Sequence, residues 1–467
     1  MRFATALLLA TALAALPLGG ARAQDAGAIG VEDGLFGTLD PPLRAARDPR
    51  VVVPVRGQVQ APVLAPVRVP VTRLAPPPPA PEPVRRARPE EADPFAPLGL
   101  RLGVLTLRPS LTQSVGIDSN PERLTAGGRA TAFSRTEGAL ALETDWSRHA
   151  LAIEARGRAD LFRGATDPRA SGEAGARLRL DIREWLDLTL DARAATARER
   201  AGTPELPGDV ARGPQVTSVE GAATLAARGA HASLSLRGAL TRTINGDARR
   251  ADGTRLSRRE ADYLEPALAL RAGYLVGPGF EPFVEAQIDE RRYVERSAAE
   301  TRESRGLTGR VGARIAASAL LSGEASVGWQ RRSFLAPGRA DVDGPVAQAA
   351  LIWSPTPLTR VSLSGESAIA ETRVAGATSA QALSASLGIS HELTRALVLD
   401  ATIGLARTDY RGAALTEDLL TASAGLEWRL SRTLAVTARY SHERLRSSAP
   451  GAGYGADIGL VGLRLAR

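Results

Sequence analysis

From Leu102 to its last residue, the chain repeats one unit. Two runs of alternating apolar and polar residues are joined by a very short turn, and a longer polar loop follows. In segment 434–441, for example, the apolar residues Val436 and Ala438 flank the polar Thr437. Successive side chains of a strand point to opposite faces, so each run has one apolar and one polar face. Short turns alternating with long loops are typical of an up-and-down β-barrel that spans a membrane. A soluble repetitive β protein is the less favoured alternative, because so many regularly spaced runs exceed what one core needs.

Eighteen alternating runs can be delimited: 102–117, 133–146, 150–162, 170–182, 186–198, 216–227, 231–244, 263–274, 280–293, 307–316, 320–334, 346–353, 360–371, 382–391, 397–410, 419–429, 434–442 and 457–465. An even number leaves both ends of the sheet on the short-turn side, as in bacterial barrels. Residues 192–201 could form a helix by propensity, but the alternation before them favours a strand. We therefore predict an all-β fold, an antiparallel up-and-down transmembrane β-barrel of about eighteen strands, for residues 99–467.

The N-terminus has the features of an export signal. Met1-Arg2 is a charged start, residues 4–18 are apolar, and Ala21-Arg22-Ala23 fits the small-x-small cleavage rule. We predict a signal peptide over 1–23, because the apolar run is too short to favour the alternative of a membrane anchor. The chain has no cysteine, so an exported form would be stabilised by hydrogen bonds and burial without disulfides.

Residues 24–98 are rich in proline and hold roughly half of the chain's 31 prolines. Proline fixes φ and removes a backbone donor, so we predict a disordered, extended periplasmic segment. The simpler interpretation is a spacer between the cleaved terminus and the barrel. The alternative is a tether that contacts peptidoglycan or a protein partner.

Charged residues of the predicted strands keep to one face. A charge facing lipid near the midplane costs about 2–4 kcal/mol, so we assign this face to the lumen. A barrel of about this strand number encloses an aqueous lumen. The basic residues assigned to it are Arg179, Arg193, Arg310, Arg314 and Arg439. The acidic ones are Asp181, Asp187, Asp191, Glu285 and Asp289. Pairing between the two sets would cancel most of the field, which predicts only a weak preference for anions.

Aromatic residues of the barrel region gather near strand ends, which predicts two girdles at the level of the lipid head groups. Those near short turns are Trp146, Trp185, Tyr274, Phe280, Phe283, Trp353 and Trp428. Those towards long loops are Phe133, Phe162, Tyr263, Tyr293, Trp329, Phe334, Tyr410, Tyr440 and Tyr454.

Composition and motifs argue against several functions. The net charge of +8 would suggest nucleic acid for a cytosolic protein, but for an exported chain it favours anionic lipids or polymers. Three histidines (His149, His231 and His391) lie near turns. His442 adjoins Ser441 and Glu443, yet neighbours on a strand face opposite ways. No metal-ligand spacing or phosphate-binding glycine loop is apparent. We expect no catalytic residues, cofactor, metal site or enzymatic activity.

Two segments resemble the Gram-negative outer-membrane proteins grouped as putative β-barrel porin 2. They are the opening strand and loop at 110–121, SLTQSVGIDSNP, and the closing hairpin at 419–442, which contains LEWRLSR and ARYSH. The resemblance covers about residues 100–467. It implies an outer-membrane barrel, often encoded with exopolysaccharide production and export genes, without established catalytic residues. Barrels of this kind usually end on an aromatic residue, whereas this chain ends Leu465-Ala466-Arg467.

The predicted location is the bacterial outer membrane. Expected partners are outer-membrane lipids, lipopolysaccharide and the barrel-assembly machinery, with polysaccharide or peptidoglycan as further candidates and no nucleic acid. The favoured function is a porin-like channel for polar solutes, or one linked to polysaccharide export. The alternative is a non-conducting structural or adhesive surface barrel, and an outer-membrane enzyme is a distant third, because no residue set supplies a nucleophile with its base.

Overall fold

The computed structural model describes residues 94–164, 169–277, 279–295, 303–318, 320–335, 339–449 and 451–467. The predicted signal peptide over 1–23 lies outside the described residues, and so does nearly all of the predicted Pro-rich segment over 24–98.

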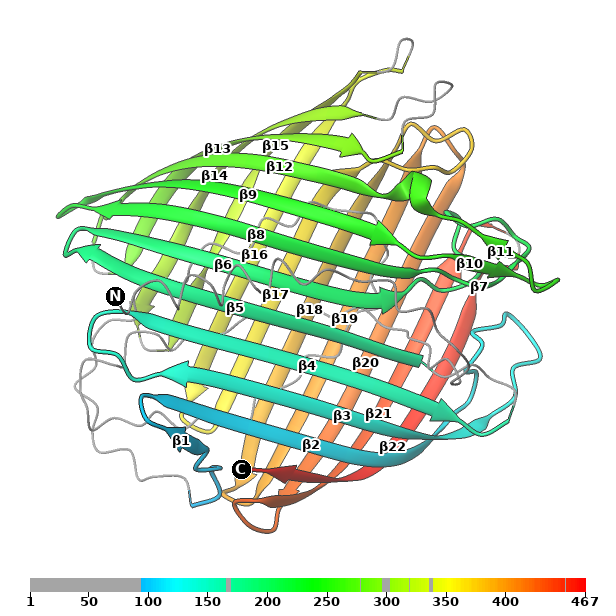
Figure 1. Cartoon of the computed structure of the whole chain (residues 1–467), viewed down its shortest axis with the longest axis horizontal. Helices are drawn as coiled ribbons and strands as arrows, with labels where there is room; N and C mark the ends of the chain where they lie inside the picture. Colours follow the sequence, from blue (N-terminus) through cyan, green and yellow to red (C-terminus); the bar gives the residue numbers. More distant parts are fainter. Residues whose placement is uncertain are drawn as a thin grey trace.

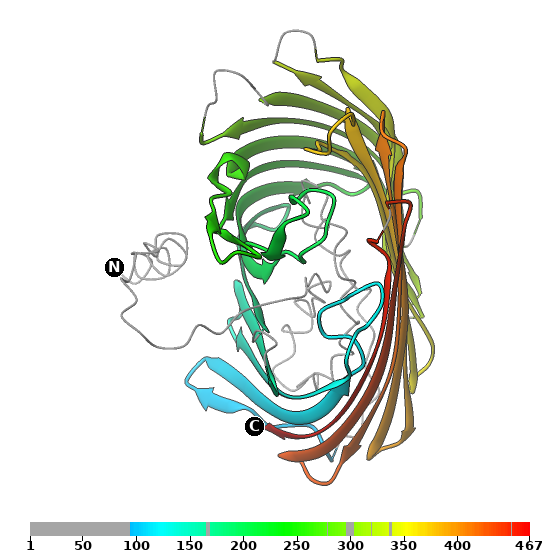
Figure 2. The same ribbon diagram turned by 90° about the vertical axis from the view of Figure 1, so that its right-hand side faces the viewer.

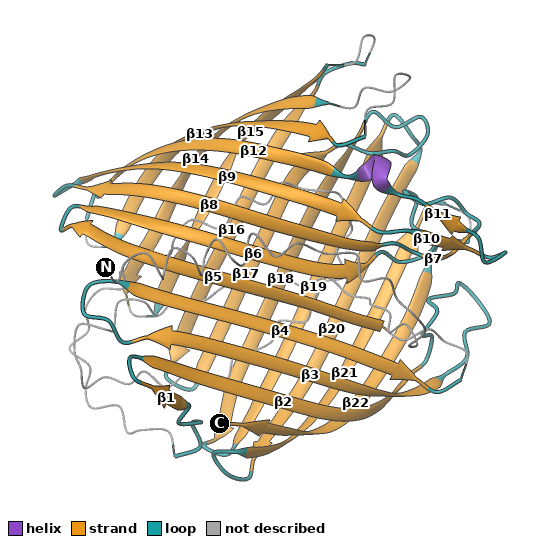
Figure 3. Cartoon of the chain, in the orientation of Figure 1, coloured by secondary structure: helices purple, strands orange, loops and turns teal. Residues whose placement is uncertain are grey.

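Eighteen long strands of the described chain form one closed antiparallel sheet (Figures 1 and 3). They are β2 (Leu105–Asp118), β3 (Thr131–Thr144), β4 (Ala150–Phe162), β5 (Arg169–Arg183), β6 (Leu186–Arg198), β8 (Gln215–Arg228), β9 (Ala232–Asn245), β12 (Tyr263–Tyr274), β13 (Phe280–Tyr293), β14 (Ser304–Ser318), β15 (Leu321–Phe334), β16 (Val342–Thr356), β17 (Thr359–Ala370), β18 (Ser379–Thr394), β19 (Leu397–Arg411), β20 (Leu415–Arg429), β21 (Leu434–Ser447) and β22 (Tyr454–Ala466). Strand β22 pairs with β2 and closes the barrel. The front and back walls cross steeply in Figure 1, because the strands tilt against the barrel axis.

Each predicted run corresponds to one of these strands, so the predicted fold class and strand number are confirmed. The strand boundaries differ in several places, one of them at the start of the barrel. The predicted first strand breaks at Gly103, which adopts a positive φ of 64° that glycine tolerates. The short strand β1 (Leu100–Leu102) then pairs back onto the beginning of β2. Strands β16, β18 and β20 begin three or four residues earlier than predicted, and β21 continues to Ser447, five residues beyond its predicted end.

The two faces of the sheet have opposite chemistry. Large apolar side chains are exposed on the outside, as for Val115, which is 66 % exposed, and Val311, which is 56 % exposed. Polar residues on the inside are buried, as for Thr308 and Gln287. A soluble domain would bury the apolar face instead, so this arrangement suits a lipid environment. No helix in the described part of the chain is long and apolar enough to cross a membrane.

At the short-turn end, five of the residues predicted to form the aromatic girdle are exposed on the outer face. They are Trp185, Tyr274, Phe280, Trp353 and Trp428. At the long-loop end the prediction was wrong for most residues. The strand register places these on the inner face, together with Phe283 near the short turns: Phe133, Phe162, Tyr263, Tyr293, Phe334, Tyr410 and Tyr454. The distance of a residue from a strand end shows how far along the barrel axis its side chain lies. It does not show whether that side chain points to the lipid or to the lumen.

These inward aromatic rings pack against one another and beneath guanidinium groups. The rings of Phe133 and Phe162 stack with centroids 5.0 Å apart. The Arg291 guanidinium lies 4.4 Å from the centroid of Tyr263, and Arg271 lies 3.9 Å from that of Phe283. Cation–π contacts of this kind stabilise both partners away from water, so the rings line the lumen wall and do not contact lipid.

Two long connections fold over the mouth of the barrel, as Figure 2 shows from the long-loop end. The β6–β8 and β9–β12 connections contribute β7 (Val210–Arg212), β10 (Ala248–Arg250) and β11 (Arg255–Leu256), which form a small separate sheet. The 3-10 helix η2 (Arg259–Ala261) leads into β12. Leu206, Val210 and Ala248 form an apolar cluster under this sheet. We call this unit, residues 199–214 and 246–262, the mouth bridge.

The mouth bridge is anchored to the opposite wall through Glu205. Its carboxylate accepts hydrogen bonds from the Thr372 hydroxyl at 2.5 Å and the Arg373 backbone N–H at 3.0 Å, both in the β17–β18 connection. Farther along the rim, the Arg200 guanidinium lies 4.7 Å from the ring centroid of Tyr454. The bridge therefore spans the opening between the β6–β9 wall and the walls formed by β17 and β22.

Candidate functional site: the charged inner wall of the barrel

The charged residues predicted to face the lumen all lie on the inner face of the sheet. Residues that lie opposite each other in neighbouring strands share a face of the sheet. Glu285 pairs with Arg310 and Gly425 with Arg439, on the face opposite the exposed apolar side chains. The same parity holds for Arg179, Asp181, Asp187, Asp191, Arg193, Asp289 and Arg314.

Most of these side chains are held in ion pairs along the wall. The Arg177 guanidinium lies 2.7 Å from Asp191, and Arg237 lies 3.4 Å from the same carboxylate and 2.9 Å from Glu220. On β5, Arg179 pairs with Asp181 at 2.5 Å. Asp187 pairs with Arg228, and Arg439 lies 3.8 Å from Asp400.

Farther round the wall, five side chains from β12 to β15 form one connected network. Arg271 bridges Glu285 at 2.7 Å and Glu324 at 2.9 Å. Arg310 shares Glu285 at 3.0 Å, and Arg314 contacts Glu324 at 3.5 Å. Each carboxylate of the network therefore serves two guanidinium groups. Glu281 also lies 3.3 Å from Arg314, so three guanidinium groups face three carboxylates and little charge is left uncompensated in the lumen at this level.

Arg193 differs from the other predicted arginines. It lies opposite Glu220 in the register, yet its Nε and Nη2 atoms are buried and have no hydrogen-bond partner in the described chain. Buried guanidinium donors normally find a partner, so these two donors are an exception on the wall.

The other part of the wall carries small, mostly uncharged groups. Lumen-facing positions of β16–β19 include Gln348, Ser364, Ser386 and Thr402. The Ser364 and Ser386 hydroxyls are 2.9 Å apart and hydrogen-bonded. The lumen thus has a charged wall over β4–β15 and a wall rich in hydroxyl groups over β16–β19.

A buried ion network, formed by Glu265, Asp289, Arg291, Arg332 and Glu371, closes the charged wall at the long-loop end. Arg291 lies 2.8 Å from Glu265 and 3.6 Å from Glu371. Arg332 contacts Asp289 and lies 3.6 Å from Glu371. Arg291 and Glu265 are each only 1 % exposed.

Glu371 lies beyond the end of β17 and is held ionised by its surroundings. Burial raises the pKa of its carboxyl group, but the charges of Arg291 and Arg332 and hydrogen bonds from Ser304 and Tyr293 outweigh this, so the pKa lies below its usual value. The Tyr293 hydroxyl donates to this carboxylate at 2.8 Å. The network therefore joins the β12–β15 wall to the segment that anchors the mouth bridge.

The sequence interpretation missed several members of this wall. Arg237, Arg271, Arg291 and Arg332 lie on the polar side of the same alternation that identified the predicted set, so that pattern could have found them. Glu371 had no such signal, because its partners are set by the way the chain turns after β17.

The histidines make local contacts. His391 Nδ1 is hydrogen-bonded to the Thr359 hydroxyl at 2.9 Å, and His149 Nδ1 accepts the Asp181 backbone N–H at 3.3 Å. His442 lies on the outer face and pairs with Asp457 at 2.8 Å, whereas Ser441 and Glu443 face inward. Within the described residues, no group of His, Cys, Asp and Glu side chains could hold a metal ion.

Solved structures with similar folds share little sequence with this chain. The structure titled copper transporter OprC is 12 % identical with a TM-score of 0.42, over 79 % of this chain and 81 % of that one. OccK2 (OpdF) of Pseudomonas aeruginosa is 12 % identical with a TM-score of 0.38, over 77 % and 97 % of the two chains. OccAB3 of Acinetobacter baumannii is 10 % identical with a TM-score of 0.38, over 78 % and 99 %.

No functionally curated protein matches the chain. A sequence model of one family matches residues 93–467, which is the whole described barrel. The geometry agrees with that match, since the barrel is closed, has an even number of strands, and is polar inside and apolar outside. The chain is an outer-membrane-type β-barrel and belongs to the family described as putative beta-barrel porin 2.

Proposed function

We propose that this barrel is an outer-membrane channel for polar solutes. The observation that carries the proposal is the inner wall, which is polar around the barrel and includes long guanidinium and carboxylate side chains. A barrel that served only as a surface scaffold would not need hydrophilic side chains along its interior. Family membership and a fold consistent with an outer-membrane location support the same proposal.

Single-channel recording in planar lipid bilayers tests this function. Purified full-length protein should give stepwise conductance increases in KCl. The rival function is a non-conducting structural or adhesive barrel, and the mouth bridge over the opening favours it. Repeated reconstitution of folded protein without current steps would contradict the channel and favour the rival.

Selectivity follows from the pairing of the wall charges. Guanidinium and carboxylate groups alternate, so we propose a weak anion preference that salt reduces further, since the Debye length is about 10 Å at 0.1 M. The double variant Arg310→Ser/Arg314→Ser leaves Glu285, Glu281 and Glu324 with fewer counter-charges. Its reversal potential in a KCl gradient should shift towards cation selectivity, and an unchanged potential would show that these arginines do not set the field.

We also propose that the Pro-rich segment over 24–98 is periplasmic and that the channel is linked to polysaccharide export, without enzymatic activity. Supporting the orientation, Pro94 lies at the short-turn end, where its carbonyl accepts a hydrogen bond from Arg432 Nε at 2.9 Å. The chain has no cysteine, so a single cysteine can be introduced at Ser448, next to a long loop, or at Ser431, in a short turn. On intact cells, an impermeant thiol reagent should label only the former. Labelling of Ser431→Cys alone would show that the barrel has the opposite orientation in the membrane.

A further inference from the structure

The barrel wall has a local gap between β16 and β17 at the long-loop end. Their ladder ends at Ala347↔Ser367, although β16 continues to Val342 beside β15 and β17 continues to Ala370 beside β18. Pro345 follows on β16, and proline has no N–H to donate to a neighbouring strand. The two strands therefore part above this point.

Side chains take the place of the missing ladder. The Ile369 backbone N–H donates to the Gln330 Oε1 atom at 3.4 Å, and Arg411 Nη1 donates to the Asp343 carbonyl at 2.8 Å. The Ile369 side chain fills the gap beside Gly344, where an added Cβ would lie 2.9 Å from Ile369 Cδ1. These contacts connect the two strands across the gap, and a hollow remains on the lumen side of the wall.

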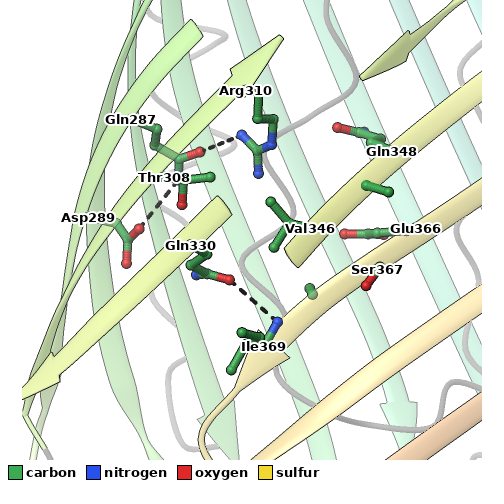
Figure 4. A pocket seen from close by; sticks show the side chains of 12 residues that line it. Gln287, Asp289, Thr308, Arg310, Gln330, Val346, Gln348, Glu366, Ser367 and Ile369 are labelled. Carbon is green, nitrogen blue, oxygen red and sulfur yellow. Dashed lines mark hydrogen bonds between the residues drawn. The ribbon is translucent and has the colours of Figure 1, made fainter. Parts of the chain in front are cut away.

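The hollow is a shallow recess that opens into the lumen, and its empty volume of about 430 Å³ includes open lumen space. Figure 4 shows how its polar side chains come from five neighbouring strands. The lining residues that face the lumen include Gln287, Thr308, Arg310, Gln330, Gln348 and Glu366.

The chemistry of the recess matches a neutral ligand that both donates and accepts hydrogen bonds. Arg310 is already held by Glu285 and by the Gln287 side-chain oxygen, each at 3.0 Å, so its charge is balanced. The Gln348 amide, with two donors and one acceptor oxygen, has no hydrogen-bond partner in the described chain. The acidic lining residues also have partners, since Asp289 pairs with Arg332 and Glu366 is engaged in an interaction of its own, so an ionic ligand finds no unpaired charge in the lining.

We propose that this recess, which we call the glutamine recess, is a binding site for a neutral polyhydroxylated ring, that is, one sugar unit of an uncharged saccharide. Vicinal hydroxyls provide adjacent donors and acceptors, which the amide of Gln348 can pair with simultaneously. The inference rests on the proposed channel function, because the ligand must reach the recess through the lumen.

Isothermal titration calorimetry of the full-length barrel in detergent tests the site without requiring conduction. The probe is maltohexaose, and an oligogalacturonate hexamer is the charged comparison. Gln348→Leu keeps the side-chain size but removes both hydrogen-bonding groups, so affinity should fall about tenfold. Ser423→Ala is the matched control, because Ser423 faces the lumen on β20 away from the recess.

Measurable maltohexaose binding that Gln348→Leu weakens and Ser423→Ala preserves would support the proposal, as would at least tenfold weaker binding of the acidic hexamer. No heat with the parent barrel, equal affinity of Gln348→Leu, or equal affinity for both saccharides would overturn it. Conductance measured on the same preparations separates the two ideas. Current without binding refutes the recess alone, and Gln348-dependent binding without current refutes the channel alone.

Discussion

Removing one guanidinium from the buried ion network at the long-loop end should destabilise the barrel severely. Arg291 is 1 % exposed, donates to Glu265 through Nε at 2.9 Å and lies 3.6 Å from Glu371. The network holds three carboxylates (Glu265, Asp289 and Glu371) against two guanidinium groups (Arg291 and Arg332), a net charge of −1. Arg291→Met keeps much of the side-chain volume but changes this net charge to −2. Loss of one partner of a buried ion pair costs about 3–5 kcal/mol.

The assay is urea unfolding of barrel refolded in lipid vesicles, followed by tryptophan fluorescence. Arg291→Met should lower the free energy of unfolding by about 3–5 kcal/mol. The double variant Arg291→Met/Glu265→Gln returns the net charge to −1 and should recover part of the loss. Arg305→Met is the control, because Arg305 faces outward on the neighbouring strand, is 66 % exposed and lies 3.8 Å from Glu290. A loss below about 1 kcal/mol for Arg291→Met, or no recovery in the double variant, would refute the reasoning.

Three further predictions concern the rim and the β16–β17 gap. The pKa of Glu371 is lowered in the folded barrel, so its contribution to stability is present above the unfolded pKa of about 4.3 and is lost as the pH falls through the folded value. Unfolding free energies at pH 7 and pH 3 should therefore differ less in Glu371→Gln than in the parent, and an equal difference would be contrary evidence. Glu205→Ala frees the mouth bridge from Thr372 and Arg373 and should raise single-channel conductance, whereas Glu122→Ala, in an exposed loop position, should not. The idea fails if both variants conduct like the parent. Gly344→Val should destabilise the barrel by about 1–3 kcal/mol through crowding against Ile369, while Gly309→Val, with open space around its Cβ position, should cost less. Equal urea midpoints for the two glycine variants would argue against the gap as described.

The strand pattern could be predicted because a period of two directly reports which side of a sheet a residue faces. Leu186 and Leu188 alternate with Asp187 and Thr189, and the structure separates these residues by face. The same logic extends to aromatic residues, but we grouped those by their distance from strand ends. Phe133 lies two residues before Arg135, so it shares the polar, inward face, and the spacing contained that information.

The mouth bridge and the gap could not be predicted in this way. Glu205 and Thr372 are 167 residues apart, and no local pattern in either loop indicates their contact. The parting of β16 and β17 depends on Pro345 together with side chains from β15 and β19. Only Pro345 is a local signal, and a proline near a strand end is also compatible with an ordinary turn. Contacts between distant loops are set by the closed barrel that brings them together.

The reversal potential of the parent barrel under a KCl gradient tests the central claim most directly, because it requires both an aqueous pore and a wall of paired charges. The account predicts stepwise current with a reversal potential close to zero, displaced slightly in the direction of anion permeability. Absence of current from folded, membrane-inserted protein would contradict the channel. Strong cation selectivity would contradict the balance of charge along the inner wall.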